Sequence, residues 1–276
     1  MTQFAINGVQ LHVEQQGRGK ETVLFCHGLL FSGRMFDDQV EYFDDRFHCV
    51  RMDFRGQGQS EVASAGYGLE TLAGDVIGLI EQLDLAPCHL VGFSMGGMVG
   101  MRVALARPDL LKSLVLMNTS AEAENWRKRP RFAALNLVAR WFGIDKVAPR
   151  ILDLLFSPRF ATEPKLAEAR QRWMAYVLSN DRIGVTRAVR GVTSRGSVLE
   201  ALDRIKLPTL IVTSDQDITT PPEKAERMQA RIAGAELATI AEAGHMSVAE
   251  QPEAVNQLLD AFLTEQSKIS DAQSVP

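Results

Sequence analysis

The sequence is poor in cysteine, and its cysteines form no recognisable ligand pattern. The three are Cys26, Cys49 and Cys88, all at or beside apolar runs, and none belongs to a C-x-x-C motif or a metal-ligand spacing. This argues against a metal site and against a redox site. Because the count is odd, we expect reduced thiols in the core of a cytoplasmic protein.

The chain also lacks a charge excess, a targeting segment and a long apolar run. The 30 Lys and Arg and the 34 Asp and Glu give a net charge of −4. The chain therefore lacks the excess of positive charge that is typical of nucleic-acid-binding proteins. The start, Met1–Phe4, has no basic region followed by an apolar stretch, and no apolar run is long enough to span a bilayer. We therefore expect a cytoplasmic protein without nucleic-acid or membrane partners.

What remains is an ordinary globular composition, with 46% hydrophobic residues in a chain of 276. That length suits one large α/β domain or a domain with an insertion. Apolar runs such as Thr22–Cys26 and His48–Asp53 lack strict alternation, as is typical of parallel strands covered on both faces. Between such runs, Leu69–Leu83 has apolar residues at helical spacing. The alternation returns at 208–213 and ends with a helix from about 251 to 263.

Between about residues 120 and 205 the sequence shows helical patterns and no convincing strand. An all-helical insertion of this kind predicts a cap over the carboxyl edge of the sheet, where open α/β sheets bind ligands. The expected domains are thus a core of residues 1–120 and 206–265 and a cap of residues 121–205. The polar end, 266–276, lacks helical periodicity and predicts a flexible tail.

The most informative motif is Gly92-Phe93-Ser94-Met95-Gly96, a G-x-S-x-G sequence. An apolar run that reads as a strand precedes it, and a run that reads as a buried helix follows it. A serine between a strand and a helix sits on a tight turn, where the two glycines leave room and the hydroxyl stands above the sheet. This pattern predicts Ser94 as a nucleophile.

A serine hydroxyl needs a base to remove its proton and a carboxylate to orient that base. His245 is the favoured base, because Gly244-His245 lies in the loop after the last predicted strand. The acid is expected between serine and histidine in the chain, where Asp217 and Asp215 both follow the strand 209–213. We favour Asp217, which stands just before the turn into Pro221-Pro222, and keep Asp215 as the alternative.

A tetrahedral oxyanion needs two backbone N–H donors. Met95, the residue after the nucleophile, is expected to supply one, and Leu29, in the loop after the strand 22–26, the other. His27 in the same loop is expected to be structural.

Together these segments resemble the α/β-hydrolase superfamily. The matching pieces are His27-Gly28-Leu29, Asp53–Ser60, the turn at Ser94, the acid loop at Asp217 and Gly244-His245. The resemblance implies an α/β fold with an eight-stranded, mostly parallel sheet, helices on both faces, a helical cap and no cofactor or metal. It also implies that Asp53–Ser60 is a structural loop near the active site.

Within the superfamily, Gly28-Leu29-Leu30 and Ser94–Met98 are most similar to 3-oxoadipate enol-lactonases and non-haem haloperoxidase-like esterases. Haloalkane dehalogenases and epoxide hydrolases of this fold carry aspartate at the nucleophile position. The serine at position 94 therefore argues against an alkyl-enzyme mechanism.

Four residues are expected to line the substrate pocket: Leu30, Phe93 and Met246, which adjoin the catalytic residues in sequence, and Trp126, at the start of the insertion. The basic stretch Trp126–Arg131 opens the insertion. One hypothesis is that Arg127, Arg129 or Arg131 clamps an anionic substrate. The favoured interpretation is a solvated basic helix start, because charge runs usually face water.

The predicted function is hydrolysis of small carboxylic esters or lactones by a cofactor-free serine carboxylesterase or lactonase, a monomer or a homo-oligomer. The same triad would also serve a C–C bond hydrolase of meta-cleavage or β-diketone type. A hydrolase-fold protein that only binds a ligand is a third possibility, against which the intact set of catalytic residue types argues.

Overall fold

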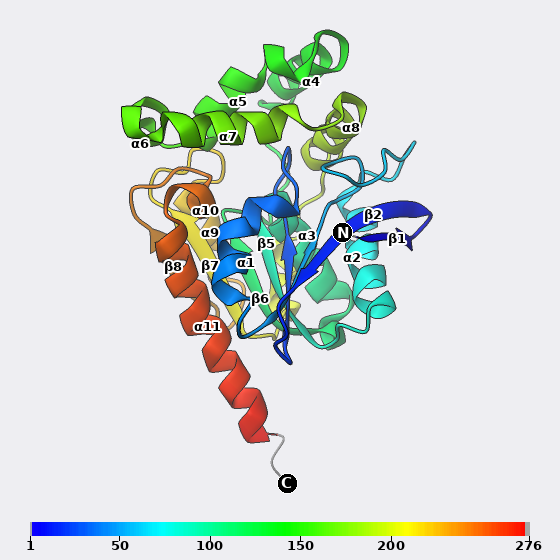
Figure 1. Cartoon of the computed structure of the whole chain (residues 1–276), viewed down its shortest axis with the longest axis vertical. Coiled ribbons are helices and arrows are strands. Elements are labelled where there is room, and N and C mark those ends of the chain that lie inside the picture. Colours follow the sequence, from blue (N-terminus) through cyan, green and yellow to red (C-terminus); the bar gives the residue numbers. More distant parts are fainter. Residues whose placement is uncertain (1, 274–276) are drawn as a thin grey trace.

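A computed structural model of the chain describes the backbone of residues 2–273 and the side chains of residues 2–268. Its strands form one sheet in the order β1-β2-β4-β3-β5-β6-β7-β8 (Figure 1). They are β1 (Thr2–Ile6), β2 (Val9–Gln16), β3 (Thr22–Cys26), β4 (His48–Met52), β5 (Cys88–Phe93), β6 (Leu111–Met117), β7 (Thr209–Ser214) and β8 (Glu236–Ile240). The pairs β1–β2 and β2–β4 are antiparallel and the other five are parallel. The mostly parallel, eight-stranded sheet predicted from the sequence is confirmed.

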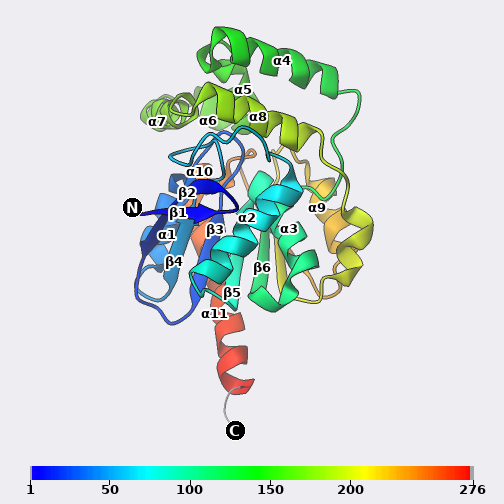
Figure 2. The same cartoon turned by 90° about the vertical axis from the view of Figure 1, so that its right-hand side faces the viewer.

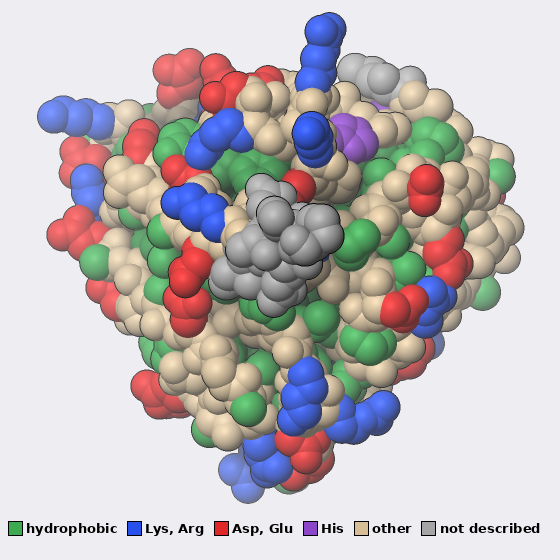
Figure 3. All heavy atoms as spheres, turned by 90° about the horizontal axis from the view of Figure 1, so that it is seen from below, with side chains coloured by type: hydrophobic (Ala, Val, Ile, Leu, Met, Phe, Trp, Pro, Cys, Tyr) green, Lys and Arg blue, Asp and Glu red, His purple; other side chains and the backbone are tan. Residues whose placement is uncertain are grey.

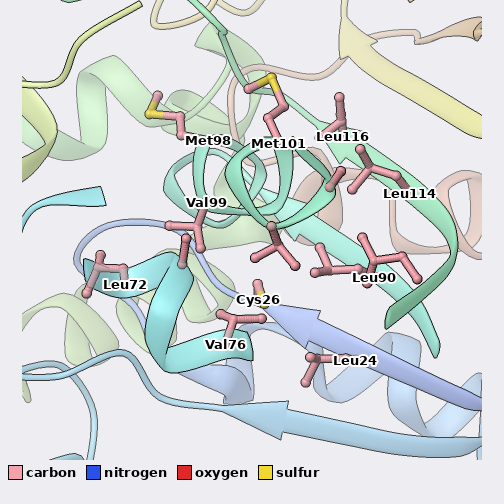
Figure 4. Packing of buried hydrophobic residues seen from close by; sticks show 14 of the residues in the cluster. Leu24, Cys26, Leu72, Val76, Leu90, Met98, Val99, Met101, Leu114 and Leu116 are labelled. Atoms are coloured by element: carbon pink, nitrogen blue, oxygen red, sulfur yellow. The ribbon is translucent and has the colours of Figure 1, made fainter. Parts of the chain in front are cut away.

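Helices cover both faces of this sheet, because its central strands are apolar on both sides. In β3, Leu24 and Cys26 belong to the core on one face, and Val23 and Phe25 belong to the core on the other. The flanking helices are α1 (Asp37–Phe43), α2 (Leu69–Gln82), α3 (Met95–Ala106), α9 (Pro222–Gln229), α10 (Ser247–Glu250) and α11 (Pro252–Gln273). Helices α2 and α3 pack on the first face (Figure 4), and α1 and α11 pack on the second.

The chain between β6 and β7 is helical and lies beyond the carboxyl ends of the parallel strands (Figures 1 and 2). It contains α4 (Arg129–Phe142), α5 (Ala148–Leu155), α6 (Pro158–Thr162), α7 (Ala167–Leu178) and α8 (Arg182–Thr193). This agrees with the helical patterns of the sequence. The segment therefore stands above the edge at which the predicted site residues meet.

The last helix is longer than the sequence predicts. A flexible tail is expected from residue 266, but α11 continues to Gln273. Gln266 is buried, and the Ser267 hydroxyl donates a hydrogen bond to the Glu21 carboxylate just before β3. These contacts give the polar sequence a face that packs on the core, which its composition does not reveal. Residues 274–276 of the expected tail lie outside the described part of the chain.

The molecular surface is mixed in charge. The end of the molecule opposite α4–α8 carries basic and acidic side chains side by side (Figure 3), in keeping with the net charge of −4. No helix within residues 2–273 has the length and apolar character that crossing a membrane requires.

Two glycines bring α8 into direct contact with the loop that follows β4. A Cβ atom at Gly184 would lie 2.0 Å from the carbonyl oxygen of Gly56, and one at Gly191 would lie 1.8 Å from that of Tyr67. Distances this short leave no room for a methyl group. The backbone of α8 therefore rests on the core, which fixes the height of the helical segment above the sheet.

Replacing Gly191 by alanine should destabilise the protein, although alanine normally favours a helix over glycine by about 1 kcal/mol. The added methyl group must push α8 off the loop, at a cost of about 1–3 kcal/mol for overpacking. Gly196→Ala is the matched control, because nothing lies within 4 Å of its Cβ position. Thermal melting should give a Tm several degrees lower for Gly191→Ala alone. Equal Tm values for the two variants would contradict the close packing.

Candidate active site

Ser94 occupies a strained turn between β5 and α3. Its backbone has φ 50° and ψ −110°, a region that residues with a side chain rarely adopt. A Cβ atom at Gly92 would lie 2.6 Å from the carbonyl oxygen of Gly96, and one at Gly96 would lie 1.9 Å from that of Cys26. Only glycine fits at both positions, which is the physical reason for the G-x-S-x-G pattern.

Ser94, His245 and Asp217 form one hydrogen-bonded chain. The Ser94 Oγ lies 2.9 Å from His245 Nε2, and His245 Nδ1 lies 2.8 Å from Asp217 Oδ2. An ionised carboxylate can only accept a hydrogen bond, so Nδ1 carries the proton and Nε2 is left to accept the serine hydroxyl. The loops after β5, β7 and β8 thus bring together three residues that are far apart in sequence. The arrangement can move the hydroxyl proton of Ser94 onto His245.

The alternative acid, Asp215, has a different role. Its carboxylate accepts hydrogen bonds from the backbone N–H groups of Glu242 at 3.1 Å and Ala243 at 3.3 Å. These bonds fix the loop that leads into His245. Asp217, and not Asp215, contacts the histidine ring.

The Asp217 carboxylate is buried, and both of its oxygen atoms accept several hydrogen bonds. Its Oδ1 accepts the backbone N–H groups of Thr219 and Thr220, each at 2.8 Å. Its Oδ2 accepts Asn118 Nδ2 at 3.0 Å and the Thr220 hydroxyl at 2.7 Å, besides His245. Burial raises the pKa of this carboxyl group, but the electrostatic interaction with His245 and the hydrogen bonds outweigh burial and lower the pKa to about 2. The group therefore stays ionised beside the histidine.

Asn118, just after β6, is a site residue that the sequence reasoning missed. Its Nδ2 donates to Asp217 and, at 2.9 Å, to the Ser214 hydroxyl, while its Oδ1 accepts the Ser247 hydroxyl at 2.6 Å. It thus ties the acid to the segment that follows His245. A lone asparagine at a strand end carries no signal for this role, since the role depends on contacts between distant segments.

The two predicted oxyanion donors, Leu29 and Met95, line the same cavity as Ser94. Met95 begins α3, so its backbone N–H has no partner within the helix. Leu29 lies in the loop after β3. Gln57 holds the two segments together, because its Oε1 accepts the Leu30 N–H at 2.8 Å and its Nε2 lies 3.9 Å from Met95 Sδ.

His27 is structural, as the sequence predicts. Its Nδ1 donates to the carbonyl oxygen of Gly28 at 2.7 Å, and its Nε2 accepts the backbone N–H of Phe54 at 2.9 Å. Burial lowers the pKa of this imidazole below its ordinary value, against the opposing charge of Asp53. The neutral ring therefore links the loop of Leu29 to the loop that contains Gln57.

A cavity of about 190 Å³ opens onto Ser94 and His245. Helices α4, α5 and α8 supply much of its apolar wall, including Phe132, Ile151 and Val189. An apolar wall with few polar groups is typical of a site for a small organic molecule.

Two of the four predicted pocket residues, Leu30 and Phe93, line this cavity. Trp126 is 71% exposed on the outer surface, so the prediction that it lines the pocket is wrong. Met246 is fully buried in the core beneath the sheet edge and is also outside the cavity lining. A position next to His245, or at the start of the helical insertion, does not determine to which side a side chain points, which is why the predictions for Met246 and Trp126 failed.

The basic stretch before α4 does not clamp a substrate in the cavity. Arg127, Arg129 and Arg131 are all exposed and lie outside its lining. The favoured interpretation of this stretch, a solvated helix start, holds. Two other basic residues, Arg195 and Lys224, do line the cavity. Nothing in their sequence context distinguishes them from ordinary surface charges.

The cysteines and the metal-ligating residue types form no further site. Cys26, Cys49 and Cys88 are buried and free, and burial raises the pKa of all three thiols, to about 12 for Cys49 and Cys88. Such thiols are poor nucleophiles at neutral pH. Within the described residues, no group of three or more His, Cys, Asp or Glu side chains could hold a metal ion.

Known proteins resemble the chain over nearly its whole length. The profile of the alpha/beta hydrolase fold family matches residues 21–252. The chain is 26% identical over 248 residues to 3-oxoadipate enol-lactonase 2 of Acinetobacter baylyi, which covers 88% of the chain and 89% of the relative.

Solved structures give the same result. A thermophilic esterase from Thermogutta terrifontis superposes with a TM-score of 0.89 at 27% identity, covering 96% of this chain and 98% of that one. The enol-lactonase from Burkholderia xenovorans LB400 gives a TM-score of 0.86 at 25% identity, with coverages of 95% and 100%. The resemblance to the superfamily and to its enol-lactonases, predicted from the sequence, is confirmed.

The low pKa of Asp217 predicts how the stability of the protein depends on pH. The folded pKa, about 2, lies below the ordinary value of 3.8, so the ionised group stabilises the fold above about pH 4 and loses this effect as the pH falls toward 2. The stabilisation is about 2 kcal/mol. Asp217→Asn should therefore melt at a lower temperature than the wild type from pH 5 to 8, and the difference should shrink below pH 4. A difference that is constant down to pH 2 would contradict the depressed pKa.

Proposed function

The chain belongs to the alpha/beta hydrolase fold family, and from this premise we propose that it is a serine hydrolase that cleaves carboxylic ester or lactone bonds of small molecules. Ser94 is the nucleophile, His245 the base and Asp217 the acid that orients it. The observation that carries the proposal is the 2.9 Å hydrogen bond between Ser94 Oγ and the free nitrogen of His245.

In the first half of the proposed reaction, Ser94 Oγ attacks the carbonyl carbon while His245 Nε2 takes the hydroxyl proton. The carbonyl oxygen becomes an oxyanion that accepts hydrogen bonds from the backbone N–H groups of Leu29 and Met95. Collapse of this intermediate breaks the bond to the alcohol oxygen, which takes the proton from His245. The acyl group is left on Ser94.

In the second half, a water molecule attacks the acyl carbon and gives a proton to His245. The resulting intermediate expels Ser94 Oγ, which recovers that proton, and the carboxylic acid is released. Asp217 stabilises the imidazolium that forms in each half. Every proton transfer uses a residue of the chain itself, so the proposal includes no cofactor.

We further propose that residues 121–205 act as a cap on a core of residues 1–120 and 206–265. Helices α4, α5 and α8 contribute apolar side chains to the cavity at Ser94. Such a wall would exclude bulk water and select the acyl group. The similarity to the esterase from Thermogutta terrifontis and to two enol-lactonases supports ester and lactone substrates as the class.

The proposal predicts that the protein hydrolyses p-nitrophenyl acetate, butyrate and octanoate with a clear preference for one chain length. Ser94→Ala should lower kcat by at least about a thousandfold, because it removes the nucleophile. Ser179→Ala is the control, since Ser179 is exposed at the end of α7. Release of p-nitrophenolate, followed by absorbance, is the measurement.

Two outcomes would contradict the proposal. Ester hydrolysis that persists in Ser94→Ala would exclude this serine as the nucleophile. A folded wild type that hydrolyses no ester but cleaves a vinylogous diketone would instead assign the site to C–C bond hydrolysis.

A further inference from the structure

Three charged side chains stand in the mostly apolar wall of the active-site cavity: Glu124, Arg195 and Lys224. Arg195 is only 5% exposed and is held firmly. Its Nε donates to the carbonyl oxygen of Glu122 at 2.9 Å, and its Nη1 donates to that of Val192 at 2.8 Å and to the Glu124 carboxylate at 3.2 Å. A charge that is this buried and this well bonded marks a built polar end of the cavity.

Lys224, in the first turn of α9, is the residue of this group whose charge has no partner among the described residues. It is half-buried, and its ammonium group forms no hydrogen bond or ion pair with any described residue. The nearby carboxylates already have partners, because Glu124 pairs with Arg195 at 3.2 Å and Glu122 pairs with Arg227 at 2.7 Å. The polar end of the cavity therefore carries a positive charge in excess.

We propose that Lys224, supported by Arg195, binds a carboxylate at the far end of the substrate's acyl group. The substrate class is then a half-ester of a dicarboxylic acid, or a lactone whose acyl chain carries a second, free carboxylate. This inference rests on the proposed function and makes it more specific.

The electrostatics of Lys224 favour this assignment. Burial lowers the pKa of its ammonium group below the ordinary value of lysine, and the positive charge of Arg195 lowers it further, against Glu122 and Glu124. An anion placed between the two basic groups would offset both effects. Charge-assisted hydrogen bonds from an ammonium and a guanidinium group are the strongest that a carboxylate can accept from side chains.

The acyl portion, rather than the alcohol, is the part we assign to this end. The acyl group stays attached to Ser94 through both chemical steps, whereas the alcohol leaves after the first. A fixed positive charge in the wall would thus keep the acyl group in one position during attack by Ser94 and during hydrolysis of the acyl-enzyme. Most of the remaining lining is apolar, so the cavity suits a methylene chain between the two carboxyl carbons.

The test compares the p-nitrophenyl esters of hexanoic acid and adipic acid, which have six acyl carbons each and differ in a terminal methyl or carboxylate. The readout is the ratio of kcat/KM for the adipate to that for the hexanoate, because a ratio cancels general damage to the site. We expect the wild type to prefer the adipate. Lys224→Met should lower the ratio at least tenfold, mainly through KM of the adipate, and Lys224→Arg should restore most of it.

Lys165→Met is the matched control. Lys165 is also a lysine without an ion partner among the described residues, but it is exposed and outside the cavity lining. Its removal changes the net charge equally, so a ratio that falls as much in Lys165→Met would show that only long-range electrostatics are involved and would overturn the assignment.

The remaining outcomes separate the two proposals. A wild type that hydrolyses the hexanoate through Ser94 but disfavours the adipate, or a ratio unchanged in Lys224→Met, would overturn the carboxylate site and leave the serine hydrolase intact. No hydrolysis of either ester by the folded wild type would instead contradict the proposed function.

Discussion

The left-handed backbone of Ser94 is the constraint on which the site depends. A positive φ at a residue with a side chain costs about 1–3 kcal/mol, and surrounding contacts must offset it. Here the Ser94 N–H donates to the carbonyl oxygen of Met117 at 2.8 Å, and the Thr119 hydroxyl donates to the Ser94 carbonyl oxygen at 2.6 Å. Because Gly96 has no side chain, the start of α3 packs directly against the end of β3. The hydroxyl of Ser94 is thereby held above the sheet, facing His245.

Side-chain hydrogen bonds between segments that are far apart in the sequence, rather than a local motif, position Asp217. Asn118 follows β6, Asp217 follows β7 and Ser247 follows the loop of His245, and hydrogen bonds connect all three. Because the carboxyl ends of parallel strands meet at one edge, short side chains suffice to bridge them. The network keeps Asp217 ionised and fixes the histidine ring, so the candidate active site is built on rigid elements.

The parts of this protein that could be predicted from sequence are those that local residues determine. The turn at Ser94 requires glycine on both sides, and the strands of a covered parallel sheet must be apolar throughout, so both leave a readable pattern. Asn118 and Lys224 leave none, because their roles come from contacts with distant segments. The direction of a side chain is equally unreadable, and for that reason Trp126 and Met246 were wrongly expected in the pocket.

The length of the last helix and the polar end of the cavity illustrate the same limit. The sequence of α11 past residue 265 is polar, and its contacts with the core, through the buried Gln266 and through Ser267 and Glu21, explain why it remains helical. The basic stretch at 127–131 is conspicuous in sequence yet faces solvent, whereas Arg195 and Lys224 are inconspicuous and line the cavity. Local charge density therefore predicts exposure better than it predicts binding.

The most direct test of the central claim, that Ser94 forms a covalent acyl-enzyme, is labelling with a p-nitrophenyl alkylphosphonate. Attack by a serine oxygen on phosphorus releases p-nitrophenolate and leaves a stable phosphonate ester. The intact mass and the masses of the proteolytic peptides then count and locate the label. We expect one equivalent of p-nitrophenolate and one label per chain, on the peptide that contains Ser94. A label on another residue, or a folded protein that takes up none, would contradict it.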